Sequence, residues 1–255
     1  MGKIIAIVNQ KGGVGKTTTA INLSAAVGAA NKRVLLIDID PQGNTTGGFG
    51  INKREVNIST YDLLIGRHSI SEVIVKTNFA GVDICPANID LAGAEIELVD
   101  MPQRETRLKS ELASVRHAYD FIFIDCPPSL GLITLNALTA ADTALVPIQC
   151  EFFALEGLSQ LMATVRQVKR LKNPQLELEG VLLTMFDGRL NLTQQVVNEV
   201  KRFFPRQVFS AAIPRSVRLS EAPSFGKPIL YYDRASKGAY AYNDLADEII
   251  KKNNM

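Results

Sequence analysis

Residues 9–19 read N-Q-K-G-G-V-G-K-T-T-T and combine glycines, lysines and hydroxyl groups at the spacing of a phosphate-binding loop. Gly12, Gly13 and Gly15 carry no side chain where backbone N–H groups must approach phosphate oxygens, and glycine permits positive φ. A helix beginning near Lys16 would turn its N-terminal dipole towards the anion. Lys16 is expected to reach the β- and γ-phosphates of a nucleotide, and the Thr17 hydroxyl to bind Mg²⁺.

The loop departs from the ordinary pattern G-x-x-x-x-G-K-[ST] at its first position, where Gln10 replaces glycine. A second lysine, Lys11, opens the glycine run. Lys16 already supplies the cation that one phosphate loop requires. Lys11 therefore has no role within a single chain that this pattern explains.

Two acidic residues follow apolar runs. Asp40 lies in D-I-D-P-Q-G-N, just beyond a run that ends at Asp38. Near a phosphate loop, its carboxylate could orient an attacking water or hold a metal-bound water, although it could equally cap a turn. Asp125 ends the run F-I-F-I-D, which is typical of a strand whose carboxylate contacts the Mg²⁺ shell. Pro127 and Pro128 then end that strand.

Short apolar runs alternate with longer helical patterns along the chain. The strands expected from these runs are 4–8, 34–38, 82–86, 121–125, 144–147, 181–184 and 208–212, and the helices are 17–30, 105–119, 155–171, 192–204 and 240–252. This alternation predicts an α/β fold with a doubly wound, mostly parallel β-sheet flanked by helices. Since no linker or repeat interrupts it, residues 1–255 are expected to form a single domain.

The 255 residues have an ordinary globular composition, with 46% hydrophobic and 21% charged residues and a net charge of +2. No signal-peptide pattern or long apolar span is present, and three widely spaced cysteines suggest reduced thiols, so a cytoplasmic protein is expected. Charge is uneven: residues 1–160 carry 13 Lys and Arg against 17 Asp and Glu, whereas residues 161–255 carry 15 against 9. The aromatic pairs 152–153 and 203–204 are expected in the core or in dimer packing.

The variant K-G-G-V-G-K-T resembles the deviant Walker A motif of the ParA/MinD superfamily of P-loop ATPases. The segments D-I-D-P-Q-G-N-T-T-G-G, D-C-P-P-S-L-G, P-I-Q-C-E-F-F-A-L-E-G-L and I-P-R-S-V-R-L-S-E-A-P-S-F-G-K-P-I resemble the ParA/Soj chromosome-partitioning ATPases over nearly the whole chain. The loop starts at about residue 9, so an N-terminal DNA-binding extension is not expected.

This resemblance implies an ATP- and Mg²⁺-dependent sandwich dimer with two nucleotides at its interface. Lys11 would contact the phosphates held by the other subunit, Asp40 would position the attacking water, and Asp125 would reach the metal through water. Pro214 and Ser216 are similar to the family's adenine-contacting loop. The implied ATP site comprises Lys11, Gly12, Gly13, Val14, Gly15, Lys16, Thr17, Thr18, Pro214 and Ser216, with catalytic roles for Lys11, Lys16 and Asp40 and metal roles for Thr17, Asp40 and Asp125.

The resemblance also implies non-specific binding to double-stranded DNA on the nucleoid and slow ATP hydrolysis stimulated by a ParB-type partner. Affinity for DNA without sequence preference comes from Lys and Arg on phosphates. Arg189 and Arg218 lie in segments that resemble the family's DNA-contacting surface. The further candidates are Lys201, Arg202 and Arg215.

Three alternatives differ in what they require. A MinD-like membrane-cycling ATPase needs a C-terminal amphipathic helix that is rich in lysine, but Asp244, Asp247 and Glu248 in this segment would repel anionic lipid. An electron carrier of the nitrogenase-reductase type needs paired thiolates at the subunit interface, and Cys126 and Cys150 do not lie in the required motifs. The third alternative is a nucleotide-gated adaptor that binds ATP and barely hydrolyses it.

Overall fold

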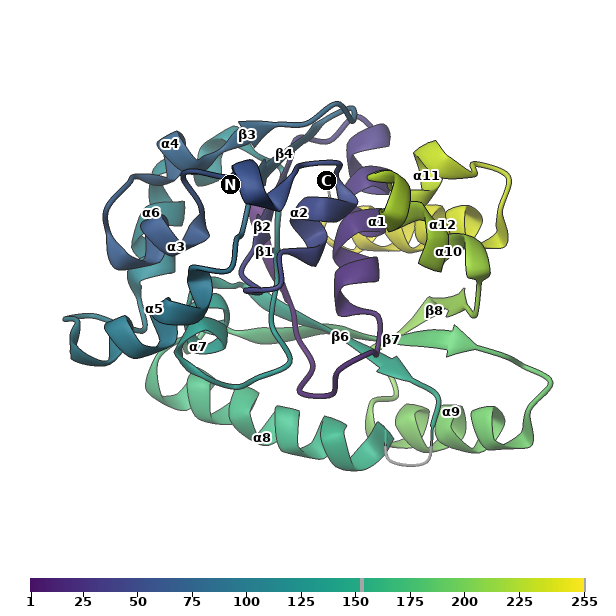
Figure 1. Cartoon of the computed structure of the whole chain (residues 1–255). Helices are drawn as coiled ribbons and strands as arrows, with labels where there is room; N and C mark the ends of the chain where they lie inside the picture. The colour runs from purple at the N-terminus through teal and green to yellow at the C-terminus, as the bar shows by residue number, and fades with distance from the viewer. Residues whose placement is uncertain (152–153, 255) are drawn as a thin grey trace.

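The computed structural model describes residues 1–151 and 154–254, and within these residues eight strands form one sheet (Figure 1). The strands are β1 (Lys3–Ile7), β2 (Val34–Asp38), β3 (Val75–Lys76), β4 (Val82–Cys85), β5 (Phe121–Asp125), β6 (Thr143–Gln149), β7 (Glu177–Phe186) and β8 (Val208–Pro214), in the order β3-β4-β2-β5-β1-β6-β7-β8. Neighbouring strands are parallel except β3, which is antiparallel to β4. The predicted fold class and all seven predicted strands are confirmed; β3, with two exposed residues, has no apolar pattern to reveal it.

The helices are α1 (Lys16–Ala29), α2 (Asn44–Gly48), α3 (Thr60–Ile65), α4 (Ile70–Val73), α5 (Leu91–Glu97), α6 (Arg107–Val115), α7 (Leu132–Ala140), α8 (Ala154–Leu171), α9 (Asn191–Phe203), α10 (Val217–Glu221), α11 (Ile229–Tyr232) and α12 (Lys237–Lys252), with short 3₁₀ turns at Lys53–Glu55, Leu98–Asp100, Arg116–Ala118 and Ala222–Phe225. The five predicted helices correspond to α1, α6, α8, α9 and α12. The others were missed because four to nine residues span too few turns for a helical period to show.

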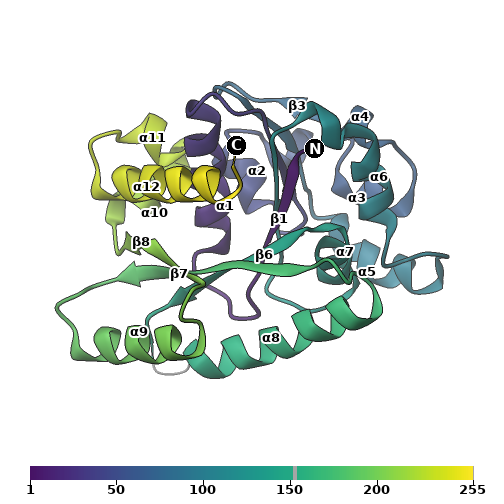
Figure 2. The same cartoon turned by 180° about the vertical axis from the view of Figure 1, so that it is seen from behind.

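Alternate residues of the central strands point to opposite faces of the sheet. In β1, Ile4 and Ala6 pack in one cluster, and Ile5 and Ile7 pack in the other. The first cluster is covered by α3 to α9, and the second by α1, α2, α10, α11 and α12, so helices cover both faces (Figures 1 and 2). Phe203 is exposed and Phe204 packs against the first cluster, whereas residues 152–153 lie outside the described residues.

The central strand β1 lies between β5 and β6, and the loops that follow parallel strands leave the sheet at one edge. That edge carries the glycine loop after β1, the segment of Asp40 after β2 and the segment after β5. Open α/β sheets bind ligands in the crevice at such a point, where the strand order changes direction. The topology therefore brings the sequence-predicted residues to one place.

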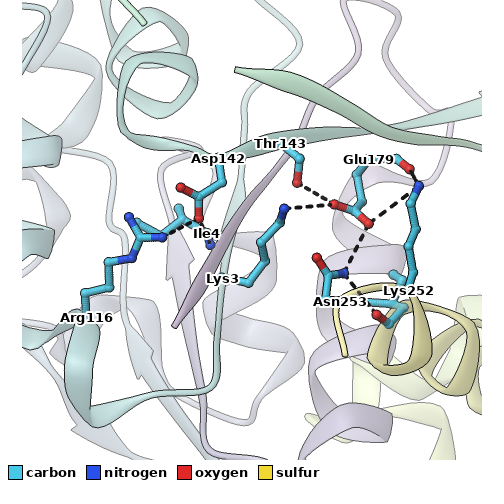
Figure 3. Close-up of polar contacts among 9 residues, drawn as sticks. Lys3, Ile4, Arg116, Asp142, Thr143, Glu179, Lys252 and Asn253 are labelled. Carbon is cyan, nitrogen blue, oxygen red and sulfur yellow. Dashed lines mark hydrogen bonds and ion pairs between the residues drawn. The ribbon is translucent and has the colours of Figure 1, made fainter. Parts of the chain in front are cut away.

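A buried carboxylate holds the end of the last helix to the opposite, amino-terminal edge of the sheet (Figure 3). Glu179 of β7 is 1% exposed and accepts a hydrogen bond from the Thr143 hydroxyl at 2.6 Å. It also lies 3.6 Å from the Lys3 ammonium and 3.7 Å from that of Lys252, and it accepts from the Asn253 side chain at 3.2 Å. One side chain thus joins β1, β6 and β7 to the end of α12.

We expect Glu179→Ala to lower the free energy of unfolding by about 2–4 kcal/mol, because it leaves two cations and a buried hydroxyl without their acceptor. Chemical denaturation would measure this loss. Glu177 lies two residues before Glu179 and forms an exposed ion pair with Lys169. Glu177→Ala should lower the free energy of unfolding much less, since exposed ion pairs contribute little. Equal losses in the two variants would show that the Glu179 network does not stabilise the fold.

Candidate functional site

The glycine loop connects β1 to α1 with two residues in the left-handed region. Gly13 has a φ of 75°, and Gly15, the N-cap of α1, has a φ of 88°. A Cβ at Gly13 would meet nothing within 4 Å, so the backbone conformation, and not crowding, requires glycine there. The side chain of Val14 is buried, and its carbonyl accepts a hydrogen bond from the Thr184 hydroxyl of β7 at 2.8 Å.

Lys16, the first residue of α1, folds back across this loop. Lys16 is buried, with only 6% of its surface exposed, and its ammonium donates to the Lys11 carbonyl at 3.2 Å. Burial lowers the pKa of Lys16, while the nearby carboxylates of Asp125 and Asp40 act in the opposite direction. A cation held in a desolvated loop interacts more strongly with an anion than the same cation would in water.

The strand carboxylate Asp125 is fully buried beside the loop and only partly satisfied. Its Oδ2 accepts hydrogen bonds from the hydroxyls of Thr17, at 2.9 Å, and Thr45, at 2.7 Å. Its Oδ1 is also buried and has no hydrogen-bond partner among the described residues. Burial raises the pKa of Asp125, and the charge of Asp38 raises it further. An unsatisfied buried carboxylate oxygen is costly unless something polar binds it.

Asp38 and Asp40 differ in their surroundings. Asp38 pairs in register with Asp125 on the adjacent strand and is fully buried; it accepts from the Thr46 N–H at 2.8 Å, the Thr46 hydroxyl at 2.7 Å and the Asp40 N–H at 3.1 Å. Asp40 lies on the wall of the phosphate-loop cavity, and its Oδ1 accepts from the Gln42 N–H at 2.9 Å. Asp40 therefore caps the turn, as the sequence allows, and also lines the cavity.

Two adjoining cavities lie along the loop. One of about 310 Å³ is lined by Gly12, Gly13, Lys16, Thr17, Asp40 and Pro128, among others. The second, of about 190 Å³, is lined by Pro214, Ser216, Leu219 and Tyr242, among others. Gly15, Thr18 and Met185 line both. The structure thus brings Pro214 and Ser216 next to the phosphate loop.

Sequence reasoning missed Thr45, Met185 and Tyr242 as lining or supporting residues. Met185 has a φ of 49°, which is uncommon for a residue with a side chain and is concentrated at functional sites. Tyr242 lies in the last helix and contacts the Thr19 hydroxyl at 3.3 Å, more than two hundred residues away in the chain. Of these three residues, only Thr45 lies in a motif, D-P-Q-G-N-T-T, from which a role in the site could have been predicted.

The Lys11 side chain does not line the phosphate-loop cavity, whereas that of Lys16 does. The Lys11 ammonium forms an ion pair with Glu151 of its own chain at 2.8 Å, and the two side chains are 41% and 48% exposed. Its backbone N–H donates to the Asn9 side chain at 3.0 Å. No sequence pattern indicates that Glu151 pairs with Lys11, because the two residues are 140 positions apart.

Three of the basic candidates follow the ends of the neighbouring strands β7 and β8. Phe186 and Pro214 pair in register on these parallel strands, so the loops carrying Arg189 and Arg215 leave the sheet side by side. Arg218 follows in α10. Lys201 and Arg202 are exposed in the last turn of α9, roughly 15 Å along that helix from its start. The structure therefore places Arg189 and Arg215 in neighbouring loops, with Arg218 just beyond Arg215, and places Lys201 and Arg202 at the far end of α9.

One face of the last helix, α12, is apolar and is covered by the core. Ala239, Tyr242, Leu245, Ala246 and Ile249 of α12 are all buried in the second core cluster. Among the described residues, no helix combines the length and the apolar character that crossing a membrane requires.

Comparisons with known proteins agree closely. A family model described as an AAA domain matches residues 2–178. The sporulation initiation inhibitor protein Soj of Bacillus subtilis is 58% identical, with 98% of each chain covered. The chromosome partitioning protein ParA of Myxococcus xanthus is 53% identical, with 99% of this chain and 89% of that one covered.

A solved structure extends the comparison to three dimensions. It is described as cobyrinic acid a,c-diamide synthase from Mycobacterium smegmatis with bound ADP and magnesium. It is 39% identical to this chain and covers 98% of it with a TM-score of 0.87, and 95% of that chain is covered in turn.

Proposed function

This chain belongs to the ParA/Soj family of chromosome-partitioning ATPases, and we propose that ATP binding drives it into a dimer that binds double-stranded DNA without sequence preference. In this proposal a ParB-type centromere-binding partner stimulates slow ATP hydrolysis, which releases the DNA. Residues 1–255 act as one ATPase unit in the cytoplasm, on the nucleoid.

The observation that carries the ATPase proposal is that the phosphate loop and Thr17 line one cavity, and that the Thr17 hydroxyl is hydrogen-bonded to the buried Asp125 behind it. The buried, unpartnered Oδ1 of Asp125 and the Thr17 hydroxyl fit a hydrated Mg²⁺, which prefers oxygen ligands and keeps several waters. No group of three or more His, Cys, Asp or Glu side chains in the described part of the chain could hold a metal by itself. Nucleotide phosphates would therefore complete the Mg²⁺ shell, and the bound Mg²⁺ would neutralise charge on them.

The protein's own groups divide the remaining work. Lys16 and the loop N–H groups would hold the β- and γ-phosphates, and Asp40 would orient the attacking water from the cavity wall. Pro214 and Ser216 would contact the adenine in the adjoining cavity. Support for magnesium and an adenine nucleotide comes from the related solved structure, which binds ADP and magnesium.

Dimerisation would give Lys11 its role. Its side chain points to Glu151 at the loop mouth, and an exposed ion pair of this kind is cheap to break. A lysine that leaves this pair could contact the phosphates held by a second copy, where it would offset developing negative charge as an arginine finger does.

The alternatives fit the molecule less well. The apolar side chains of α12 pack in the core, so they are not free to enter a membrane. Cys85, Cys126 and Cys150 are buried, whereas a cluster shared between subunits needs thiolates at the surface.

The test of DNA binding is a titration with ATP, with ADP and without nucleotide, using the wild type and Arg218→Glu. We expect binding to require ATP and the charge reversal to weaken it roughly tenfold or more, because a phosphate contact becomes a repulsion. Arg33→Glu is the matched control: Arg33 is 61% exposed against 57% for Arg218, is also paired with a carboxylate, and precedes β2 at the opposite edge of the sheet. Binding that ignores nucleotide, or that survives Arg218→Glu unchanged, would refute the proposed surface.

A further inference from the structure

The short helix α10 belongs to both the nucleotide cavity and the proposed DNA surface. Leu219 and Ser220 of α10 line the smaller cavity, together with Ser216 just before the helix. Arg218 does not line that cavity, and its side chain is 57% exposed. A base bound in that cavity therefore touches the helix that carries Arg218.

Two carboxylates hold the Arg218 guanidinium. Its Nη1 donates to Glu221 Oε2 at 3.1 Å, and its Nε lies 3.4 Å from Asp233 Oδ2. The Tyr232 hydroxyl donates to the same oxygen of Glu221 at 3.2 Å. Glu221 ends α10 and Asp233 follows α11, so Arg218 closes the segment 217–233 on itself. The two carboxylates engage Nη1 and Nε, so a DNA phosphate that binds these nitrogens must displace a carboxylate.

Segment 217–233 is also attached to the helix that begins at the phosphate loop. The Asn22 side chain of α1 is buried, and its Oδ1 accepts a hydrogen bond from the Ile229 N–H, the first residue of α11, at 2.6 Å. The Asn22 amide donates to the Thr18 carbonyl at 2.8 Å. One side chain thus links the first turn of α1 to α11.

A second attachment reaches the segment that follows Asp40. Gly226 and Gly50, both with positive φ, lie backbone to backbone: a Cβ built on Gly226 would stand 2.5 Å from the Gly50 Cα. Phe49, at the end of α2, stacks edge-on against Phe79 with ring centroids 5.5 Å apart, and Phe79 packs on Tyr231 of α11 at 4.8 Å. The start of α2 lies at the larger cavity through Asn44. Both nucleotide-site helices therefore contact the segment that positions Arg218.

We propose that Glu221 and Asp233 compete with DNA phosphates for Arg218, and that ATP bound against α10, α1 and α2 weakens their hold. This inference rests on the proposed DNA-binding function and adds a control to it. The ion pairs are partly exposed, with 40% and 32% exposure at the two carboxylates, so each is weak enough to be exchanged for a phosphate. A small shift of the segment then changes how many N–H groups Arg218 offers to DNA.

The experiment compares DNA affinity with ATP, with ADP and without nucleotide for the double variant Glu221→Gln/Asp233→Asn. We expect affinity without ATP to rise roughly three- to tenfold, as two exposed ion pairs allow, and affinity with ATP to change little. The ratio of DNA affinity with ATP to DNA affinity without ATP should therefore decrease. Each single substitution should give a smaller shift in the same direction, which provides a second reading if the double variant does not fold.

The control is Asp244→Asn/Asp247→Asn, which removes the same charge from two exposed residues of α12. A general electrostatic gain would strengthen binding in every nucleotide state and leave the ratio unchanged. An unchanged ratio in Glu221→Gln/Asp233→Asn overturns the competition. Arg218→Ala separates the two proposals: if DNA binding survives it, the proposed surface fails, whereas if binding is lost and the ratio in the double variant stays unchanged, only the competition fails.

Discussion

Asp40→Ala is expected to lower the rate of ATP hydrolysis by about 10²–10⁴-fold while ATP stays bound, because the attacking water loses the carboxylate that orients it. Asp40 lies on the wall of the phosphate-loop cavity, and among the described residues no other carboxylate lines that cavity to take its place. A single-turnover assay with labelled ATP measures the hydrolysis step directly. The variant should also persist as an ATP-bound dimer.

The control must account for the turn that Asp40 caps through the Gln42 N–H. Asp40→Asn keeps an oxygen that can accept this hydrogen bond but carries no negative charge. It should hydrolyse ATP as slowly as Asp40→Ala. Normal turnover in Asp40→Asn would show that Asp40 serves the turn and not the reaction.

Lys11→Ala is expected to abolish ATP-dependent dimerisation and to lower hydrolysis by about 10³–10⁵-fold, the range that a cation supplied in trans contributes to phosphoryl transfer. Binding of ATP to the monomer should change by only a few-fold, because Lys11 pairs with Glu151 outside the phosphate-loop cavity, and Lys16 remains. Sedimentation with ATP reports the dimer, and a titration with a fluorescent ATP analogue reports nucleotide binding.

Lys16→Ala gives the contrasting pattern. Lys16 is buried in the loop and lines the cavity, so its loss should remove ATP binding itself, and with it the dimer. If Lys11→Ala and Lys16→Ala have the same effect on ATP binding by the monomer, Lys11 acts within its own chain. A stable dimer of Lys11→Ala with ATP would equally refute the role proposed for it across the interface.

Much of the site was predictable because its parts are contiguous. Each strand that ends in the site is a run of apolar residues, and parallel strands place their carboxyl ends at one edge, so Asp40 and Asp125 had to lie near the glycine loop. The glycines at positive φ follow from the same local pattern. The short helices α2 and α10 were not predictable, although α10 lines the smaller cavity beside the phosphate loop, because five residues carry no helical period.

The amino-acid sequence alone determined the residue types of the phosphate loop, the fold class and the family, since each follows from motifs and apolar runs of consecutive residues. Only the tertiary structure decided which groups face one another across long separations. Glu151 pairs with Lys11, Asn22 binds the N–H of Ile229, and the Arg218 guanidinium lies 3.4 Å from Asp233. Strand register and helix packing set these contacts, and no local pattern encodes them. The fold thus places Glu151 beside Lys11 and Asp233 beside Arg218. In the proposed function, dimerisation must separate the first pair and DNA binding the second.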